Sequence, residues 1–260
     1  SRSADKASPS TRRACYRRVE PPRSFDGPPV TPVLALRVHA SVAPGDPMLP
    51  GPCATVDAIR AGVGMHRLRV AAIGCAYRDD GALRVRALGL PEHDEGVLLA
   101  ELGRILERLS PRVVTWDGTA HDLALIRVRG FALGVRLPAL FGPLPEPAGH
   151  VDLIDALGLR GAQSMSLAEM AAACGLSVPV GDGAASAGTS LGASRACSAA
   201  SRAASELEAA IVLMLWSRLQ LVRGRLSPAE HAVETARVRA FAQAVPAQHW
   251  KAFAAVLPVG

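Results

Sequence analysis

The sequence lacks any apolar run of the roughly 20 residues that a membrane span requires. Its longest apolar run, residues 209–216, is typical of a buried helix segment. The five cysteines are odd in number, and none forms a C-x-x-C pair. These absences argue against a membrane span, a disulfide-built scaffold and a zinc site. They favour a reducing intracellular compartment.

Lysine is almost absent, since only Lys6 and Lys251 appear among 29 lysines and arginines. A GC-rich genome explains such a bias. Arginine also suits phosphate binding, because its planar guanidinium forms paired hydrogen bonds to phosphate oxygens. Residues 1–24 hold seven basic and two acidic residues, a net +5, which leaves +1 of the total +6 for the rest of the chain. The basic character therefore lies in one N-terminal segment.

That N-terminal segment, residues 1–32, is rich in serine, arginine and proline and poor in acids. The composition predicts an extended arm, of the kind that remains after a mitochondrial targeting peptide is cleaved. A mitochondrial location is therefore expected. The arm is also expected to bind RNA by threading among phosphates. The arginines expected to make these contacts are Arg2, Arg12, Arg13, Arg17, Arg18 and Arg23.

Strands alternate with helices along the remaining chain, which indicates a layered α/β domain. Apolar or alternating patterns predict strands at 33–38, 68–77, 82–88 and 113–116. The turn Asp79-Asp80-Gly81 predicts a hairpin between the second and third of them. Helical spacing predicts helices at 56–61, 94–109, 119–133, 166–174, 202–223, 228–244 and, as a last turn, 250–257.

Several residues mark where these helices begin and end. Asp94 and Ser227 are expected to cap helix N-termini, Ser166 with Glu169 forms a capping-box pattern, and Gly134 is expected to end a helix. Residues 178–200 are nearly all Gly, Ala, Ser and Thr and are expected to form a flexible loop. Core-facing positions of the helix at 202–223 are expected at Leu207, Ile211, Leu215 and Leu219, and Cys75 and Cys174 are expected as core thiols.

The most informative segment is VVTWDGTAHDL, residues 113–123. An apolar strand runs into an Asp/Gly turn, and a helix then opens with Asp122 in its first turn. Such a corner presents a carboxylate at a sheet edge, where a divalent cation could be held.

This segment resembles the second motif of the predicted 3′–5′ exonucleases related to the proofreading domain of B-family DNA polymerases. That motif usually reads S-W-N-G-x-x-F-D-L-P-V-L. Further stretches resembling the family follow in the same order, at 66–73, 125–135, 150–155, 166–176 and 221–227. The resemblance covers about 33–230 and implies a ribonuclease H-like fold, a mixed sheet flanked by helices in a single domain. A C-terminal helical extension, 231–260, would follow it.

The resemblance also implies a set of catalytic positions. In this family two Mg²⁺ or Mn²⁺ ions held by four carboxylates would cleave a phosphodiester. The first motif, D-I-E-T, aligns with LRVHA and places Arg37 at the aspartate and His39 at the glutamate. Asp122 matches the aspartate of the second motif. The third motif, Y-C-x-T-D, places Ala204 at the tyrosine and Glu208 at the aspartate.

These replacements predict a degenerate centre with no resident metal or other cofactor. Two unit charges ~4 Å apart repel by about 4 kcal/mol at an effective dielectric of ~20, and a divalent ion beside the Arg37 cation would double that. We expect Arg37 to form an ion pair with Asp122 instead. The alternative is an active metal-dependent exonuclease whose ligands are rearranged to Asp122, Glu208 and Asp117.

The sequence therefore favours a catalytically inactive exonuclease-like domain. It would serve as a structural or RNA-contacting subunit of a large ribonucleoprotein such as the mitochondrial ribosome, with RNA and neighbouring protein subunits as partners. A second alternative is a protein-binding module that makes no nucleic-acid contact.

Overall fold

Five strands form one mixed sheet in the order β3-β2-β1-β4-β5. The computed structural model describes residues 32–42, 64–79, 81–89, 94–142, 149–161, 165–176 and 191–257. The strands are β1 (Val33–Val42), β2 (Leu68–Arg78), β3 (Leu83–Leu88), β4 (Arg112–Thr115) and β5 (His150–Asp152). The central strand β1 pairs antiparallel with β2 and parallel with β4. The four strands expected from the sequence correspond to β1, β2, β3 and β4.

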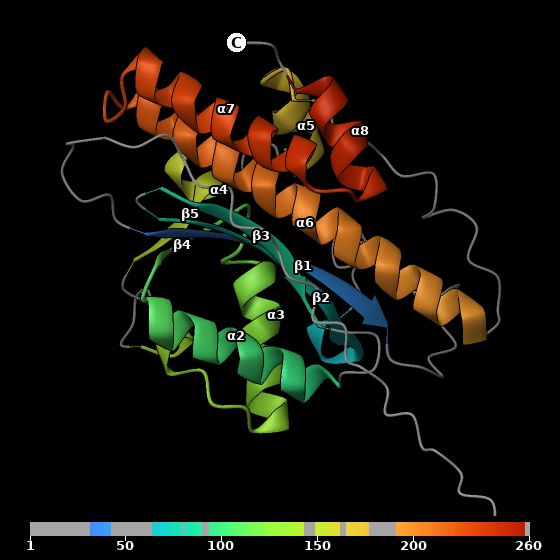
Figure 1. Ribbon diagram of the computed structural model, residues 1–260. Coiled ribbons are helices and arrows are strands. Elements are labelled where there is room, and N and C mark those ends of the chain that lie inside the picture. The colour runs from blue at the N-terminus through green and yellow to red at the C-terminus, as the bar shows by residue number, and fades with distance from the viewer. Residues whose placement is uncertain are drawn as a thin grey trace, which may run out of the picture.

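Helices cover both faces of this sheet (Figure 1). The helices α2 (Glu95–Leu109) and α3 (Asp122–Leu133) lie on one face. On the other face lie α6 (Leu191–Val222), α7 (Pro228–Ala244) and α8 (Gln248–Val256). Shorter helices are η1 (Met65–Arg67), η2 (Pro138–Leu140), α4 (Leu153–Ala156) and α5 (Leu167–Ala173). The expected mixed sheet flanked by helices is confirmed.

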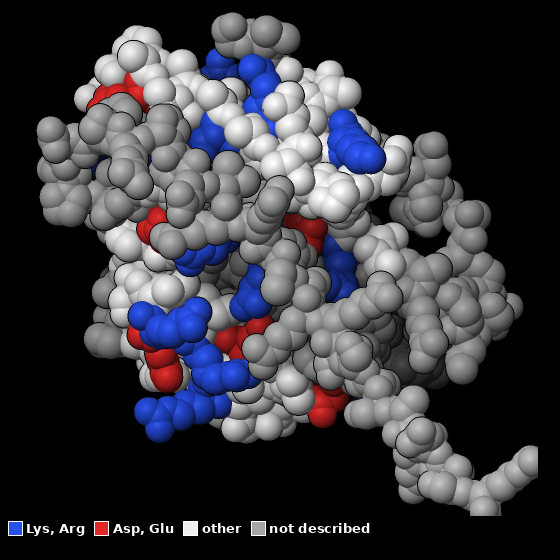
Figure 2. Space-filling model, viewed as in Figure 1, with Lys and Arg blue, Asp and Glu red and all other residues white. Residues whose placement is uncertain are grey.

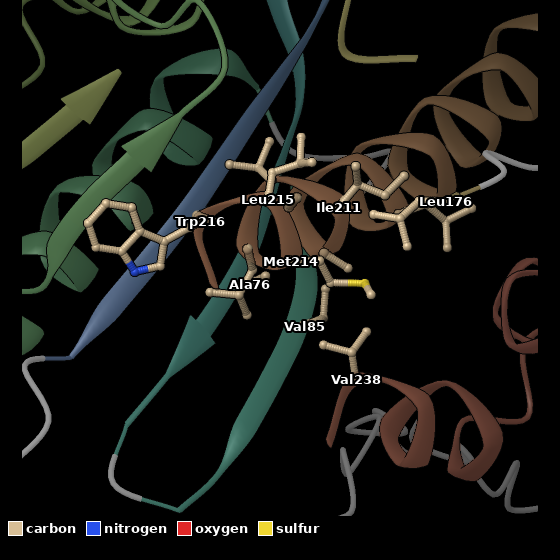
Figure 3. Close-up of a cluster of buried hydrophobic side chains, with 14 of the residues drawn as sticks. Ala76, Val85, Leu176, Ile211, Met214, Leu215, Trp216 and Val238 are labelled. Atoms are coloured by element: carbon tan, nitrogen blue, oxygen red, sulfur yellow. The ribbon is translucent and has the colours of Figure 1, made fainter. Parts of the chain in front are cut away.

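Each face of the sheet buries its own apolar cluster. Leu36, Ile73 and Leu102 belong to the cluster beneath α2 and α3. In the other cluster, Ala76 and Val85 of the sheet lie near Ile211 and Met214 of α6, and Val238 of α7 lies beyond them (Figure 3). The strands of the sheet are therefore apolar on both faces, which explains why α6 is apolar over 209–216 and why those residues are all buried.

The local helix signals are confirmed. The Asp94 side chain accepts a hydrogen bond from Val97 N at 2.8 Å. Ser166 and Glu169 form the expected capping box, and Ser227 forms another with Glu230. Gly134 ends α3 in the left-handed conformation, with φ 64°. The sequence predicts these helix ends because each depends on residues within one turn of the end.

The expected loop at 178–200 is wrong for its second half, because α6 already begins at Leu191. Alanine has the highest helix propensity of all residues, and the alanines of 191–204 extend a helix whose later turns are fixed by packing. The first half of that loop lies outside the described residues. So do the expected helix at 56–61 and the basic arm at 1–31.

Residues after 230 share the core of the domain. The expected boundary between 230 and 231 falls inside α7, which begins at Pro228. Phe241 of α7 packs edge-to-face against Trp250 of α8, with ring centroids 5.0 Å apart, and both belong to the α6 cluster. Within the described residues, no helix is long and apolar enough to cross a membrane.

Candidate functional site

A polar cluster lies where β1, α3 and α6 meet. Arg37 and His39 are two residues apart on β1, so their side chains leave the same face of the strand. Asp122 opens α3 just after β4, and Glu208 lies in the middle of α6. These are the four positions that the sequence assigned to the metal ligands of the exonuclease pattern. The structure brings all four together.

The helix α6 reaches this point because it crosses the sheet very closely. A Cβ atom at Gly74 of β2 would lie only 1.8 Å from the backbone oxygen of Ser205. Any residue other than glycine would therefore push α6 away from the strands. This close approach carries Glu208, less than one turn further along α6, to the side chains of β1.

One guanidinium bonds both carboxylates of the cluster. Arg37 Nη1 donates to Asp122 Oδ2 at 3.0 Å, and Arg37 Nε donates to Glu208 Oε2 at 2.9 Å. The same Nη1 also donates to the backbone oxygen of Trp116 at 3.2 Å. Arg37 is 6 % exposed, so these contacts replace water rather than compete with it. The expected ion pair with Asp122 is confirmed, and Glu208 shares it.

The remaining oxygens of the two carboxylates are also bonded. Asp122 Oδ1 accepts a hydrogen bond from Val38 N at 3.3 Å, and His39 Nε2 lies 3.3 Å from Glu208 Oε1. Each carboxylate therefore uses both of its oxygens inside the protein. The cluster is a closed network of side chains and backbone from β1, α3 and α6.

The network sets the protonation of its members. Burial alone would raise the pKa of Glu208, but Arg37 and His39 outweigh it and lower the pKa to about 2. Burial raises the pKa of Asp122, and Arg37 opposes that rise. Burial alone would lower the pKa of Arg37, but Asp122 and Glu208 hold it above its ordinary value. Arg37 therefore stays charged, and Glu208 is the carboxylate that it holds most firmly in the ionised form.

Stability should fall in acid because of Glu208. Since its folded pKa lies below its ordinary value of 4.5, its contribution is present above about pH 4.5 and is lost as the pH falls toward 2. The shift corresponds to about 3 kcal/mol. Asp122 acts in the opposite direction, because its pKa is raised.

The contribution of Glu208 to the free energy of unfolding is therefore isolated by measuring urea unfolding of the parent chain and of Glu208→Gln at several pH values. The two curves should converge as the pH falls, and a constant gap would contradict the expectation.

The other assigned positions contribute differently. Ala204 lies one turn before Glu208 on α6 and offers only a methyl group where the family pattern has a tyrosine hydroxyl. Asp117, the extra carboxylate of the alternative, belongs to a second cluster. Its Oδ2 lies 2.7 Å from His121 Nδ1, and its Oδ1 lies 3.5 Å from Arg160 Nη1. The six arginines of the basic arm lie outside the described residues.

Sequence reasoning missed Arg160, which holds that second cluster. Arg160 Nη2 donates to Asp152 Oδ2 at 2.9 Å and to Asp155 Oδ2 at 2.8 Å. Asp152 also accepts from the backbone N–H groups of Asp117 and Thr119, both at 2.9 Å. No local pattern connects residues that are 43 positions apart, so only the fold reveals the contact between Arg160 and Asp117. Among the residues that the structure describes, no group of three or more His, Cys, Asp and Glu side chains is arranged to hold a metal ion.

The domain is a mixed five-stranded sheet between two helical layers, with the polar cluster where β1, α3 and α6 meet. Residues 63–257 match the family of predicted 3′–5′ exonucleases related to the exonuclease domain of PolB. The match spans well over half of the chain. The chain belongs to this family, which confirms the resemblance from residue 66 onward, and the first motif at 36–40 lies before the matched residues.

One solved structure that the chain matches is the family B DNA polymerase from the hyperthermophilic archaeon Pyrobaculum calidifontis. The TM-score is 0.49 at 16% sequence identity, over 85% of this chain and 29% of that chain. This chain therefore spans less than a third of the polymerase that it matches. No curated protein matches the sequence.

Proposed function

We propose that this chain is a catalytically inactive member of the exonuclease family that serves as a structural or RNA-contacting subunit of a large ribonucleoprotein. The observation that carries the first half of this proposal is the position of Arg37. Its guanidinium bonds Asp122 and Glu208, the two carboxylates that remain at the metal-ligand positions.

The residues present do not fit two divalent cations. Such cations require anionic oxygen ligands, and this centre offers two carboxylates that are already paired with a buried cation. A metal ion placed between them would meet the Arg37 charge in surroundings that screen it poorly. His39 adds a ring nitrogen that is engaged with Glu208. We therefore derive no catalytic step through a metal at this centre.

The test combines digestion with metal binding. The parent chain is expected to leave end-labelled single-stranded RNA and DNA intact in Mg²⁺ or Mn²⁺, and calorimetry is expected to detect no Mn²⁺ binding at this centre. The double variant Arg37→Asp/His39→Glu is expected to gain Mn²⁺ affinity, because it removes the cation and adds two carboxylates beside Asp122 and Glu208.

The informative control is Asp122→Ala. Digestion by the parent chain that Asp122→Ala abolishes would establish the alternative, an active exonuclease with rearranged ligands. If neither the parent nor the double variant binds Mn²⁺, the metal is kept out by more than the charge of Arg37.

The second half of the proposal rests on charge distribution. The net +5 of residues 1–24 contrasts with +1 for the rest of the chain, which suits an arm that binds RNA phosphates and a domain that packs against protein. Because the arm is rich in arginine and serine and poor in acids, we propose a mitochondrial ribonucleoprotein, the ribosome among them, as the host assembly.

A further inference from the structure

A second surface of the domain combines arginines with exposed aromatic rings. It lies on the α2 and α3 layer, away from α6. We call it the arginine–phenylalanine surface. Its members are Arg104 and Arg108 of α2, Arg127 and Phe131 of α3, and Arg136 and Phe141 on either side of η2.

Packing contacts make this surface continuous. The segment before η2 lies directly on α2, because a Cβ atom at Gly103 would be 2.9 Å from the backbone oxygen of Arg136. The Arg136 side chain reaches along α2 to Glu107, at 3.9 Å. Arg104 and Arg108 flank these two contact points on the same helix and are exposed. Three arginines therefore gather over the C-terminal half of α2.

The aromatic rings continue the surface over η2 and α3. Arg127 Nε donates to the backbone oxygen of Leu140 at 2.9 Å, which holds Arg127 against the end of η2, where Phe141 follows in the chain. Phe131 lies one turn after Arg127 on the same side of α3. Phe131 is 83 % exposed and Phe141 is 50 % exposed. The other two described phenylalanines, Phe241 and Phe253, are buried.

The charge of this surface is positive. Its four arginines outnumber the two glutamates on the same part of α2. Glu101 pairs with Arg86 at 3.0 Å, and the contact of Glu107 with Arg136 is long and exposed and therefore contributes little. Figure 2 shows basic side chains gathered over the left-hand, C-terminal part of α2, with acidic ones interspersed. A polyanion complements such a surface, because each arginine that meets a phosphate releases condensed counterions.

We propose that the arginine–phenylalanine surface binds single-stranded nucleic acid, with unpaired bases stacked on Phe131 and Phe141 and phosphates on the flanking arginines. Every base has a flat face that stacks on an aromatic ring, and only unpaired bases offer it freely. The inference extends the RNA contact of the proposed function from the arm to the folded domain. It does not involve Arg37 or the carboxylates around it.

The test measures binding of fluorescent single-stranded RNA and DNA by anisotropy. It uses the full chain, and also a full chain whose arm is largely neutralised, from a net +5 to +1, by changing Arg12, Arg13, Arg17 and Arg18 to glutamine. In both backgrounds Phe131→Ala is expected to weaken binding roughly 5- to 100-fold. Phe131→Tyr should retain binding, since it keeps the ring. The double variant Arg104→Gln/Arg108→Gln should lower the dependence of log Kd on log salt by about 2.

The matched control is Val222→Ala, at a side chain that is 78 % exposed on the opposite layer and is expected to change nothing. Thermal unfolding checks that each variant folds. Equal affinities for Phe131→Ala and Val222→Ala would overturn the inference.

Comparing the full chain with the arm variant separates this inference from the function proposed above. If neutralising the arm abolishes binding, the arm makes the RNA contact and only the surface proposal fails. If the parent chain binds neither RNA nor DNA, both the surface and the RNA-contacting role fail. A third outcome would also overturn the inference. In it, nucleic acid does not bind, an acidic helical peptide does, and Phe131→Ala prevents the peptide from binding, so the surface would belong to a protein partner.

Discussion

Replacing Arg37 with methionine is expected to lower the free energy of unfolding at pH 7 by about 3–5 kcal/mol. The change keeps a long side chain but removes the cation that Asp122 and Glu208 share. Asp122 is 1 % exposed, so its charge would then be buried with only the hydrogen bond from Val38. Urea unfolding followed by circular dichroism measures the loss.

The control is Arg86→Met, which removes an arginine paired with Glu101 on the surface, at 3.0 Å. Exposed pairs contribute up to about 1 kcal/mol, so this variant should be nearly as stable as the parent. The triple variant Arg37→Met/Asp122→Asn/Glu208→Gln should recover most of the loss, because it removes the uncompensated charges. Similar losses for Arg37→Met and Arg86→Met would contradict a structural role for the Arg37 network.

Replacing Glu206 with alanine is expected to cost a similar amount, about 3–5 kcal/mol, for a different reason. Glu206 is 6 % exposed, and its carboxylate accepts hydrogen bonds from Ala87 N at 2.8 Å and Trp250 Nε1 at 3.2 Å. It also lies 3.0 Å from His249 Nε2. One side chain of α6 thus holds β3 and α8. Alanine would leave the two N–H donors buried without a partner, at about 1–3 kcal/mol each.

Two further variants make this expectation specific. Glu206→Gln keeps one acceptor oxygen and should lose less stability than Glu206→Ala. Glu101→Ala removes a partly exposed carboxylate and should change stability by less than about 1 kcal/mol. The tryptophan emission, to which Trp116 and Trp216 also contribute, should shift to longer wavelength in Glu206→Ala as α8 loosens around Trp250. An unchanged unfolding curve for Glu206→Ala would show that α8 is held by its apolar contacts alone.

The sequence predicted the features whose causes are local. The capping residues Asp94 and Ser166 and the stop at Gly134 each act within one helical turn, and each is present. The strand at 68–77 was readable from a continuous apolar run that suits a sheet covered on both faces. The pair between Arg37 and Asp122 was also predicted, because the order of the motifs assigns both residues to one site.

The features that the sequence did not predict depend on long-range contacts. Glu206 looks like an ordinary polar position of an amphipathic helix, and only the crossing of α6 over the sheet makes it a buried acceptor for β3 and α8. Arg160 belongs to the second cluster because the pairing of β4 with β5 brings Asp152, which Arg160 contacts, next to the end of β4. The sequence places the start of α6 too late, because a segment rich in alanine and serine can form either a loop or the first turns of a helix that is anchored further along.

The buried guanidinium of Arg37 also determines which substitutions the polar cluster tolerates. A single change from arginine to aspartate at position 37 would place a third carboxylate beside Asp122 and Glu208 and remove the cation that they share, so the folded state without bound metal would lose stability. Because one guanidinium joins β1, α3 and α6, a substitution at position 37 acts on the central strand and on both helical layers at once.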